Sequence, residues 1–263
     1  MDTREYLFDI LSQRSRFTQL LFEHPADKRT LIDELDVSRS TVDRGVRDLE
    51  TADLIEYQNG QYRLTPYGRL VAEEYDDFTR RIQIAGELKP FFRWLSLDEF
   101  PFDLKLFADA KVVVSTSSDP YAPANRHADA MNDSRSLRAM VPAVGLNQLE
   151  VAHQNVLEDD QQQQVVVESE VVDTLRSKPH YEERIQPMLS QDSVTLYQYD
   201  GAIPYFIGIY DDLVHIGVGD GEGIPRALVE TPNDAVRTEA IKLYEQYQSA
   251  ATKLSHFGAE HTD

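Results

Sequence analysis

The chain has 263 residues, with 46 acidic against 26 basic side chains, a formal net charge of −20 and no cysteine. The lack of cysteine excludes disulfides, thiolate catalysis and cysteine-ligated metal centres. No apolar run reaches the roughly 18–20 residues that a membrane-spanning helix needs, and the first residues lack the basic-then-apolar order of a signal peptide, so we expect a cytoplasmic protein.

The charged side chains are unevenly distributed. Arg outnumbers Lys by 19 to 7, and the acids are dispersed along the chain. Dispersed carboxylates with little Lys are typical of proteins adapted to very high salt, where a short Debye length weakens self-repulsion; an acidic surface in an ordinary cytoplasm is the alternative. Residues 1–70 carry a net charge of −3 and the rest −17, which predicts two modules with different partners.

Apolar periodicity predicts four helices in the N-terminal module, at 3–13, 15–24, 27–35 and 39–52. Asp27 and Ser38 are the expected N-caps of the third and fourth helices. Val42, Val46 and Leu49 recur with the spacing of one buried helical face.

The element after these helices decides the fold of the module. Residues 36–38 separate the third and fourth helices, which is the spacing of a helix-turn-helix. Two strand-like segments follow, 54–58 and 61–65, on either side of Asn59-Gly60. Both central residues of a type I′ turn need positive φ, so Asn-Gly is a strong hairpin signal. A helix-turn-helix followed by a hairpin predicts a winged helix-turn-helix DNA-binding domain over 1–66.

The outer face of the fourth helix is rich in Arg and hydroxyl side chains. In helix-turn-helix proteins this helix enters the major groove, where Arg contacts guanine or phosphate and Ser and Thr contact phosphate. With one Arg from the hairpin, the candidate DNA-binding residues are Ser38, Arg39, Ser40, Thr41, Arg44, Arg47 and Arg63. Two simpler interpretations stay open: Arg47 pairs with Asp43 one turn away, and residues 58–60 only form the turn.

A helical pattern continues from 67 to 95 after Thr65-Pro66, and Pro90 is expected to kink or break it. We assign 67–100 as a linker or dimerisation helix. Helix-turn-helix proteins usually read paired half-sites, so we expect a homodimer that forms through this helix or through the C-terminal domain. Packing of the helix on its own chain is the alternative.

From about residue 104, short strands alternate with helices, which is typical of an α/β sheet. Strands are expected at 111–115, 137–141, 163–167, 194–199, 202–210 and 214–218. Helices are expected at 125–134, 146–157, 169–176, 179–189 and 233–254. Asp200-Gly201 predicts a second hairpin. The expected fold is thus an α+β winged helix-turn-helix domain, a long linking helix, an α/β sensor or assembly domain over 101–257, and a tail at 258–263.

Several segments resemble archaeal, largely haloarchaeal, winged-helix transcription regulators whose C-terminal half is the middle domain named for a methanogenesis and filamentation regulator. The segments are 38–44, 119–126, 204–212, 216–218, 226–229 and 243–247. The resemblance extends over roughly 1–257 and contains no catalytic motif. It implies a dimeric DNA-binding regulator whose α/β domain assembles the protein or senses an unidentified small-molecule effector.

Motifs for catalysis and cofactors are missing from the sequence. Residues 215–223 are rich in Gly, but no GxxxxGK[ST] is present and Pro225 interrupts any following helix, so a tight loop between strands is expected. The histidines are scattered, and no activated nucleophile supports a hydrolase. Two acidic clusters are expected in solvated turns rather than at a metal, Asp211-Asp212 and Asp220 with Glu222. We expect neither cofactor, metal nor enzymatic activity.

A ligand sensed by the C-terminal domain is expected near the loop after strand 111–115, because α/β sheets bind ligands at the carboxyl ends of strands. Ser115, Asp119, Asn125 and Arg126 are the candidate ligand-binding residues there. The alternative is that these side chains only make turn and cap hydrogen bonds.

The expected function is a sequence-specific DNA-binding transcription regulator with double-stranded DNA as its partner. Helix 39–52 would lie in the major groove, with hairpin 54–65 on the backbone. The alternative is a protein-interaction adaptor without DNA binding, which the net charge of −3 in the first module and −17 in the second favours.

Overall fold

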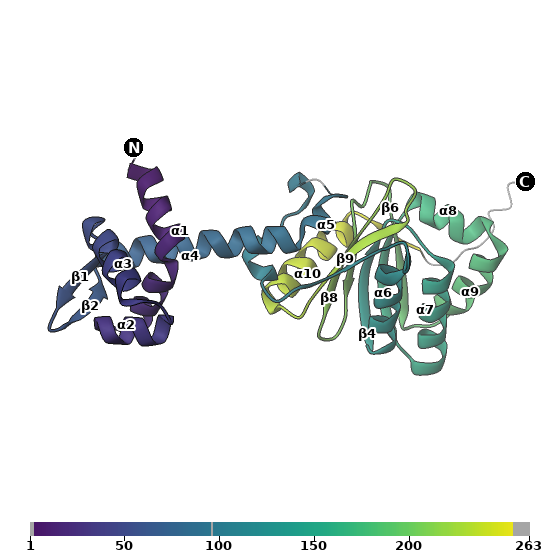
Figure 1. The fold of residues 1–263 in the computed structure, drawn as a ribbon. Coiled ribbons are helices and arrows are strands. Elements are labelled where there is room, and N and C mark those ends of the chain that lie inside the picture. The colour runs from purple at the N-terminus through teal and green to yellow at the C-terminus, as the bar shows by residue number, and fades with distance from the viewer. Residues whose placement is uncertain (1–2, 96, 255–263) are drawn as a thin grey trace, which may run out of the picture. The chain divides into compact units, whose positions relative to one another are not determined.

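The computed structural model describes residues 3–95 and 97–254 (Figure 1). It divides into two compact units, Met1–Gln83 and Ile84–Asp263. The division falls inside one helix, α4 (Pro66–Glu87), within the segment 67–100 that we assigned as a linker. The predicted tail, 258–263, lies outside the described residues.

The first unit opens with one helix where we predicted two. α1 runs from Thr3 to Glu23 without a break, so the predicted division into 3–13 and 15–24 is wrong. The polar residues in its middle make tertiary contacts instead of ending the helix: Arg14 donates to the Asp48 carboxylate at 2.8 Å, and Arg16 donates to the Leu35 carbonyl at 2.9 Å. Nothing in this stretch breaks a helix, because it contains neither Pro nor Gly.

The next two helices and their caps are confirmed. They are α2 (Lys28–Leu35) and α3 (Arg39–Thr51). The Asp27 carboxylate accepts from the Thr30 amide at 2.8 Å, and the Ser38 hydroxyl accepts from the Thr41 amide at 3.2 Å. The apolar faces of both helices pack in one core with α1, where Leu31, Val42 and Leu49 are fully buried.

The hairpin is confirmed in position and turn geometry. Strands β1 (Ile55–Gln58) and β2 (Gln61–Leu64) pair antiparallel, and Asn59 and Gly60 have φ of 53° and 87°. These are the positive values that a type I′ turn requires. The Thr65 hydroxyl then accepts from the Gly68 amide at 2.8 Å and so caps α4. A Cβ on Gly68 would lie 1.8 Å from the Leu54 carbonyl oxygen, so this close approach of α4 to the preceding chain requires glycine.

The predicted break near Pro90 is confirmed. α4 ends at Glu87, and a short helix, α5 (Lys89–Phe92), begins after Leu88 with Pro90 in its first turn. Two 3₁₀ turns follow at Leu97–Glu99 and Leu104–Phe107. Helix α5 and the two 3₁₀ turns belong to the second unit.

The second unit is built on one mixed sheet with the strand order β10-β6-β5-β4-β7-β8-β9-β3. Its parallel part comprises β4 (Ser136–Val141), β5 (Gln162–Glu168) and β6 (Val194–Tyr199). Its antiparallel part comprises β7 (Phe206–Ile209), β8 (Val214–Gly219), β9 (Pro225–Thr231) and β3 (Lys111–Val114), with β10 (Thr252–Leu254) on the opposite edge. The expected α/β class therefore applies to three strands, and the unit as a whole is α+β.

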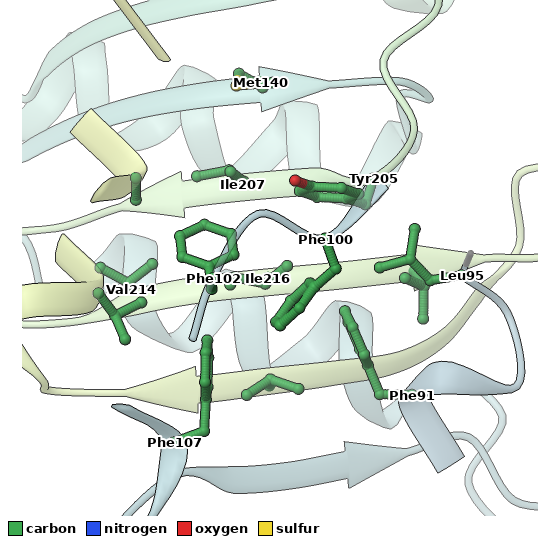
Figure 2. Packing of buried hydrophobic residues seen from close by; sticks show 14 of the residues in the cluster. Phe91, Leu95, Phe100, Phe102, Phe107, Met140, Tyr205, Ile207, Val214 and Ile216 are labelled. Carbon is green, nitrogen blue, oxygen red and sulfur yellow. The ribbon is translucent and has the colours of Figure 1, made fainter. Parts of the chain in front are cut away.

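Alternate side chains of this sheet enter two separate cores. Met140 and Val166 face one core, whereas Ala139 and Val167 face the other. The first core is covered by α10 (Asp234–Ser249) and by five aromatic and aliphatic side chains of the connecting segment, which Figure 2 shows over the strands: Phe91, Leu95, Phe100, Phe102 and Phe107. The second core is covered by α6 (Ala122–Asn132), α7 (Leu146–Asp159), α8 (Ser169–Ser177) and α9 (Pro179–Leu189).

The predicted hairpin at Asp200-Gly201 is wrong. β6 pairs with β5 and β10, whereas β7 pairs with β4 and β8. Neither residue has a positive φ. The loop is held to the sheet instead, because Ser169 donates to the Asp200 carboxylate at 2.9 Å and the Ile203 amide donates to Glu168 at 2.6 Å.

Two further differences concern the end of the chain. The helix predicted over 233–254 ends at Ser249, and Thr252–Leu254 forms β10 along β6. We did not predict β9, because Pro225 and the glycines before it read as a loop. Pro225 is the first residue of that strand, a position where the missing amide proton is tolerated.

Candidate nucleic-acid interface

The predicted DNA-binding residues of α3 lie on the first nine residues of that helix, and most of them are exposed. Arg39, Ser40, Arg44 and Arg47 are all exposed, and Thr41 is half-buried. Within the described residues, no ion pair involves Arg39, Arg44 or Arg47. Arg44 makes one long contact, 3.4 Å to the Ser40 carbonyl. Three guanidinium groups are thus available to an anionic partner.

The hydroxyl groups at the same helix start are linked to one another. The Ser38 hydroxyl lies 2.9 Å from both the Ser40 and the Thr41 hydroxyls, besides capping the helix. The amide groups of a helix N-terminus favour anions. The first turn of α3 therefore presents hydroxyl groups and Arg39 to one patch of solvent.

Asp43 pairs with a residue that the sequence did not single out. Its carboxylate lies 2.6 Å from the Lys28 ammonium of α2. This hydrogen bond lowers the pKa of Asp43 and raises that of Lys28, so both groups stay charged. The interpretation in which Arg47 pairs with Asp43 is therefore wrong. Helical spacing had suggested that pair, whereas no local pattern identifies Lys28.

On the hairpin, Arg63 is engaged. It lies opposite Glu56 in the strand register, and the two side chains form a salt bridge at 2.6 Å. The structure thus places Arg63 with Glu56 rather than with the free Arg residues of α3. Tyr57, next to this pair, keeps 59% of its surface exposed and packs on the Tyr62 ring at 4.9 Å.

The four candidate ligand residues of the second unit separate in the structure. Ser115 hydrogen-bonds through its amide to the Arg226 carbonyl at 2.9 Å, and the Asp119 amide binds the Thr116 hydroxyl. Asn125 lines a cavity of about 840 Å³. Arg126 forms a 2.6 Å ion pair with Glu230. The strand that ends at this loop, β3, is an antiparallel edge strand, so the rule for parallel α/β sheets does not apply to it.

A buried polar cluster that sequence reasoning missed lies beside that cavity. Glu230 accepts hydrogen bonds from Arg126 and, at 3.0 Å, from His215. Burial opposes ionisation of Glu230, but these two hydrogen bonds lower its pKa below the usual value. The Tyr210 ring packs on His215 at 4.9 Å, and its hydroxyl is hydrogen-bonded to His127 Nδ1. Strands β8 and β9, helix α6 and the residue that follows β7 bring these side chains together.

The Gly-rich segment after β8 is the tight loop we predicted. Gly223 has a φ of 77°, and the Asp220 carboxylate accepts from the Glu222 and Ile224 amides at 3.0 Å. The Asp211 carboxylate caps the start of β4 in the same way, accepting from the Arg135 amide at 2.8 Å. In 3–95 and 97–254 no group of three or more His, Asp or Glu side chains is arranged to hold a metal ion.

Each of the two units matches the domain of a known protein family. Residues 1–87 match the HVO_A0261 N-terminal domain, and residues 120–250 match the middle domain of the methanogenesis regulatory protein FilR1. The chain therefore carries an HVO_A0261-type N-terminal domain followed by a FilR1-type middle domain. This confirms the resemblance seen in the sequence. The candidate DNA-binding residues all lie in the N-terminal domain, and the cavity lies in the FilR1-type middle domain.

The matching solved structures share little sequence identity with the chain. The archaeal chromatin protein TrmBL2, described as showing a novel mode of DNA binding, is 14% identical over 88% of each chain, with a TM-score of 0.43. NucT from Helicobacter pylori and the phospholipase D family member Nuc from Salmonella typhimurium are each 11% identical over 55% of this chain and 98% of theirs, with TM-scores of 0.44 and 0.43. Scores this low support no argument about function. No curated protein matches the chain, and no helix in its described part is long and apolar enough to cross a membrane.

Proposed function

We propose that the chain is a sequence-specific, DNA-binding transcription regulator. In this proposal the N-terminal domain is a winged helix-turn-helix, with α3 in the major groove and the β1–β2 hairpin on the phosphate backbone. The observation that carries it is the exposed face of α3, where Arg39, Arg44 and Arg47 form no ion pair within the described residues. The protein would act in the cytoplasm and catalyse no reaction.

The residues would divide their roles by position. Arg39 and Arg44, nearest the helix start, would reach base edges, where a bidentate Arg–guanine contact discriminates by about 1–3 kcal/mol. Ser38, Ser40 and Thr41 would bind phosphate at the helix N-terminus. Arg47 would follow along the groove. Arg63 would contact the backbone only by leaving Glu56.

A homodimer is the second part of the proposal. The exposed apolar side chains of α4 in the first unit gather within about a third of the helix circumference, at 3.6 residues per turn: Tyr67, Leu70, Phe78 and Ile82. The exposed Phe8 of α1 packs on Phe78 at 5.4 Å and extends this stripe. A second copy would bury the stripe and bring two recognition helices about 34 Å apart, one helical turn of DNA.

The decisive experiment starts from genomic fragments selected by the purified protein. Binding to a selected site and to a scrambled site is measured by fluorescence anisotropy. We expect Arg39→Ala with Arg44→Ala to reduce affinity for the selected site by at least tenfold and to reduce the preference over the scrambled site. The control, Arg135→Ala with Arg138→Ala, removes the same charge from exposed positions of the second unit and should bind as the wild type does.

Two outcomes contradict this proposal. One is equal affinity of the wild type for every DNA, and the other is full binding by the Arg39/Arg44 variant. A stable protein partner recovered with no DNA retained at any salt concentration would favour the adaptor alternative, which the net charges of −3 and −17 for the two modules support.

A further inference from the structure

The FilR1-type middle domain contains a cavity of about 840 Å³ that no part of the DNA-binding proposal uses. Its walls come from the second core, between one face of the sheet and helices α6, α7, α8 and α9. Small-molecule sites in proteins are typically about 300–1,000 Å³ and mostly apolar. The volume alone therefore suits a ligand of drug or metabolite size.

The chemistry of the wall restricts the charge of the ligand. No Lys, Arg, Ser or Thr lines the cavity. Its two acids are already engaged: Asp220 pairs with Arg226 at 2.5 Å, and Glu168 accepts the Ile203 amide. Burial raises the pKa of Glu168, which disfavours its charged form. An anionic ligand would find no cation here, and burying an unpaired charge is costly.

One polar side chain of the wall has an unused donor. The Tyr210 hydroxyl is hydrogen-bonded to His127 Nδ1, and we assign the hydroxyl as the donor because it has no other acceptor among the described residues. Burial lowers the pKa of His127 to about 3, so the ring is neutral and carries its proton on Nε2. No hydrogen bond in the described chain uses that Nε2–H group. The ring is held in place by the edge of Phe206, 4.5 Å away, which also lines the cavity.

The rim of the cavity is apolar and partly open. Tyr121, Leu146 and Ile224 line it, and each is among the exposed large hydrophobic side chains of the chain. Val141 and Glu168, at the carboxyl ends of the parallel strands β4 and β5, lie on the same wall. Ligands of open sheets with parallel strands bind at this end.

We propose that this cavity binds an uncharged, largely apolar small molecule that carries a hydrogen-bond acceptor for His127 Nε2–H. The inference gives a chemical class to the small-molecule effector expected from the sequence, and its regulatory meaning rests on the proposed function. The binding event itself requires no DNA. A failure of ligand binding and a failure of DNA binding are therefore measured separately.

Three fluorescent probes separate the features of the proposal. Prodan is neutral and carries a ketone acceptor, N-phenyl-1-naphthylamine is neutral without a carbonyl, and 8-anilinonaphthalene-1-sulfonate is the same skeleton with a sulfonate. Each is titrated into the full-length protein without DNA. We expect saturable binding of both neutral probes near one per chain, and at least tenfold weaker binding of the sulfonate. Non-saturable neutral probes, or a sulfonate within threefold of its neutral analogue, would overturn the proposal.

Variants locate the site. Ala152 lines the cavity from α7 and is buried, whereas its neighbour Val151 does not line it. Ala152→Phe fills the cavity and should weaken both neutral probes at least tenfold, while Val151→Phe should leave them unchanged. His127→Phe should weaken Prodan about fivefold or more and spare N-phenyl-1-naphthylamine. Melting temperatures show that each variant is folded.

A measurement on the wild type tests the same site even if Ala152→Phe does not fold. Hydrogen exchange is followed with and without N-phenyl-1-naphthylamine. Protection should concentrate in α7 and in the strands that line the cavity, β4 and β5. Protection confined to the first unit or to α10, or undiminished probe binding by a folded Ala152→Phe, would refute the site.

Discussion

Lys28 on α2 and Asp43 on α3 form an ion pair of 2.6 Å that joins these two consecutive helices. The pair occupies the Asp43 carboxylate, which lies one helical turn before Arg47. Arg47 therefore stays with Arg39 and Arg44 as an unpaired cation. A tertiary contact thus sets the charge of the proposed DNA-binding surface.

Replacing Asp43 separates the structural role of this pair from its electrostatic one. Both side chains are about 40% exposed, so Asp43→Asn should lower the free energy of unfolding only slightly. DNA affinity should rise about two- to fivefold, because a carboxylate is removed beside the phosphates. Urea unfolding and anisotropy give the two values. Asp33→Asn on α2 is the matched control, and a fall in affinity for Asp43→Asn would contradict this account.

Salt dependence tests the interpretation of the acidic composition. A protein that makes 6–10 phosphate contacts usually loses about 10³–10⁵ in affinity between 50 and 200 mM salt. We expect binding here to persist in molar KCl, with a shallow slope, because the surplus acids belong to the second module and few cations face the DNA. Anisotropy titrations from 0.05 to 2 M KCl measure the slope. A steep collapse below 200 mM would favour an ordinary acidic surface.

The same substitution at two glycines should have opposite effects. Gly60→Ala forces an L-residue into a φ of 87° in the hairpin turn and should destabilise the first unit by about 1 kcal/mol. Gly86 lies in α4 with no atom within 4 Å of an added Cβ. Gly86→Ala should therefore be neutral or stabilise by up to about 1 kcal/mol. Thermal unfolding of both variants checks the signs, and a stabilising Gly60→Ala would refute the type I′ turn.

The stability of the middle domain should fall in acid because of His127. Burial, reinforced by the nearby His215, lowers its folded pKa to about 3 from an ordinary value of 6.5. Between these values the unfolded chain binds a proton that the folded chain does not, so stability falls as pH falls, by up to about 1.4 kcal/mol per unit. His127→Phe should reduce this slope in urea unfolding at pH 7, 6 and 5. The exposed His180→Phe should retain it; equal slopes in all three proteins would exclude His127 as the cause.

Charges placed in the α4 stripe test the proposed dimer. Leu70 and Ile82 are 58% and 59% exposed, so Leu70→Glu with Ile82→Glu should cost a monomer little stability. If a second copy covers the stripe, the double variant should become monomeric in light scattering and bind paired half-sites at least tenfold more weakly. A dimer of unchanged mass would assign dimerisation to the middle domain. Glu73→Leu with Glu74→Leu on the same helix is a control for surface composition.

Local chemistry explains which predictions succeeded. Asn59-Gly60 marked a hairpin because both residues take positive φ, a requirement that few other dipeptides meet. Ser38 and Asp27 were identifiable as caps because each side chain reaches an amide three residues away. In each case the interacting groups are neighbours in sequence.

The wrong or missed predictions concern groups that are distant from one another in sequence. Asp200-Gly201 has the composition of a hairpin, yet the loop is fixed by Glu168 and Ser169, which precede it by some thirty residues. Leu254 continues a helical pattern but joins β10 because β6 offers a free edge. His127, Tyr210 and His215 came from three separate segments, so no spacing rule could identify them as one cluster beside the cavity. Lys28 and Asp43 are likewise on separate helices, so no local pattern predicts their ion pair.

β10 has a consequence beyond its three residues. Thr252–Leu254 occupies the backbone of Leu196, Tyr197 and Gln198 on the outer side of β6. Without it, that side would present unsatisfied amide and carbonyl groups, which are a template for another extended chain. The segment after α10 therefore prevents another chain from pairing with this edge of the sheet.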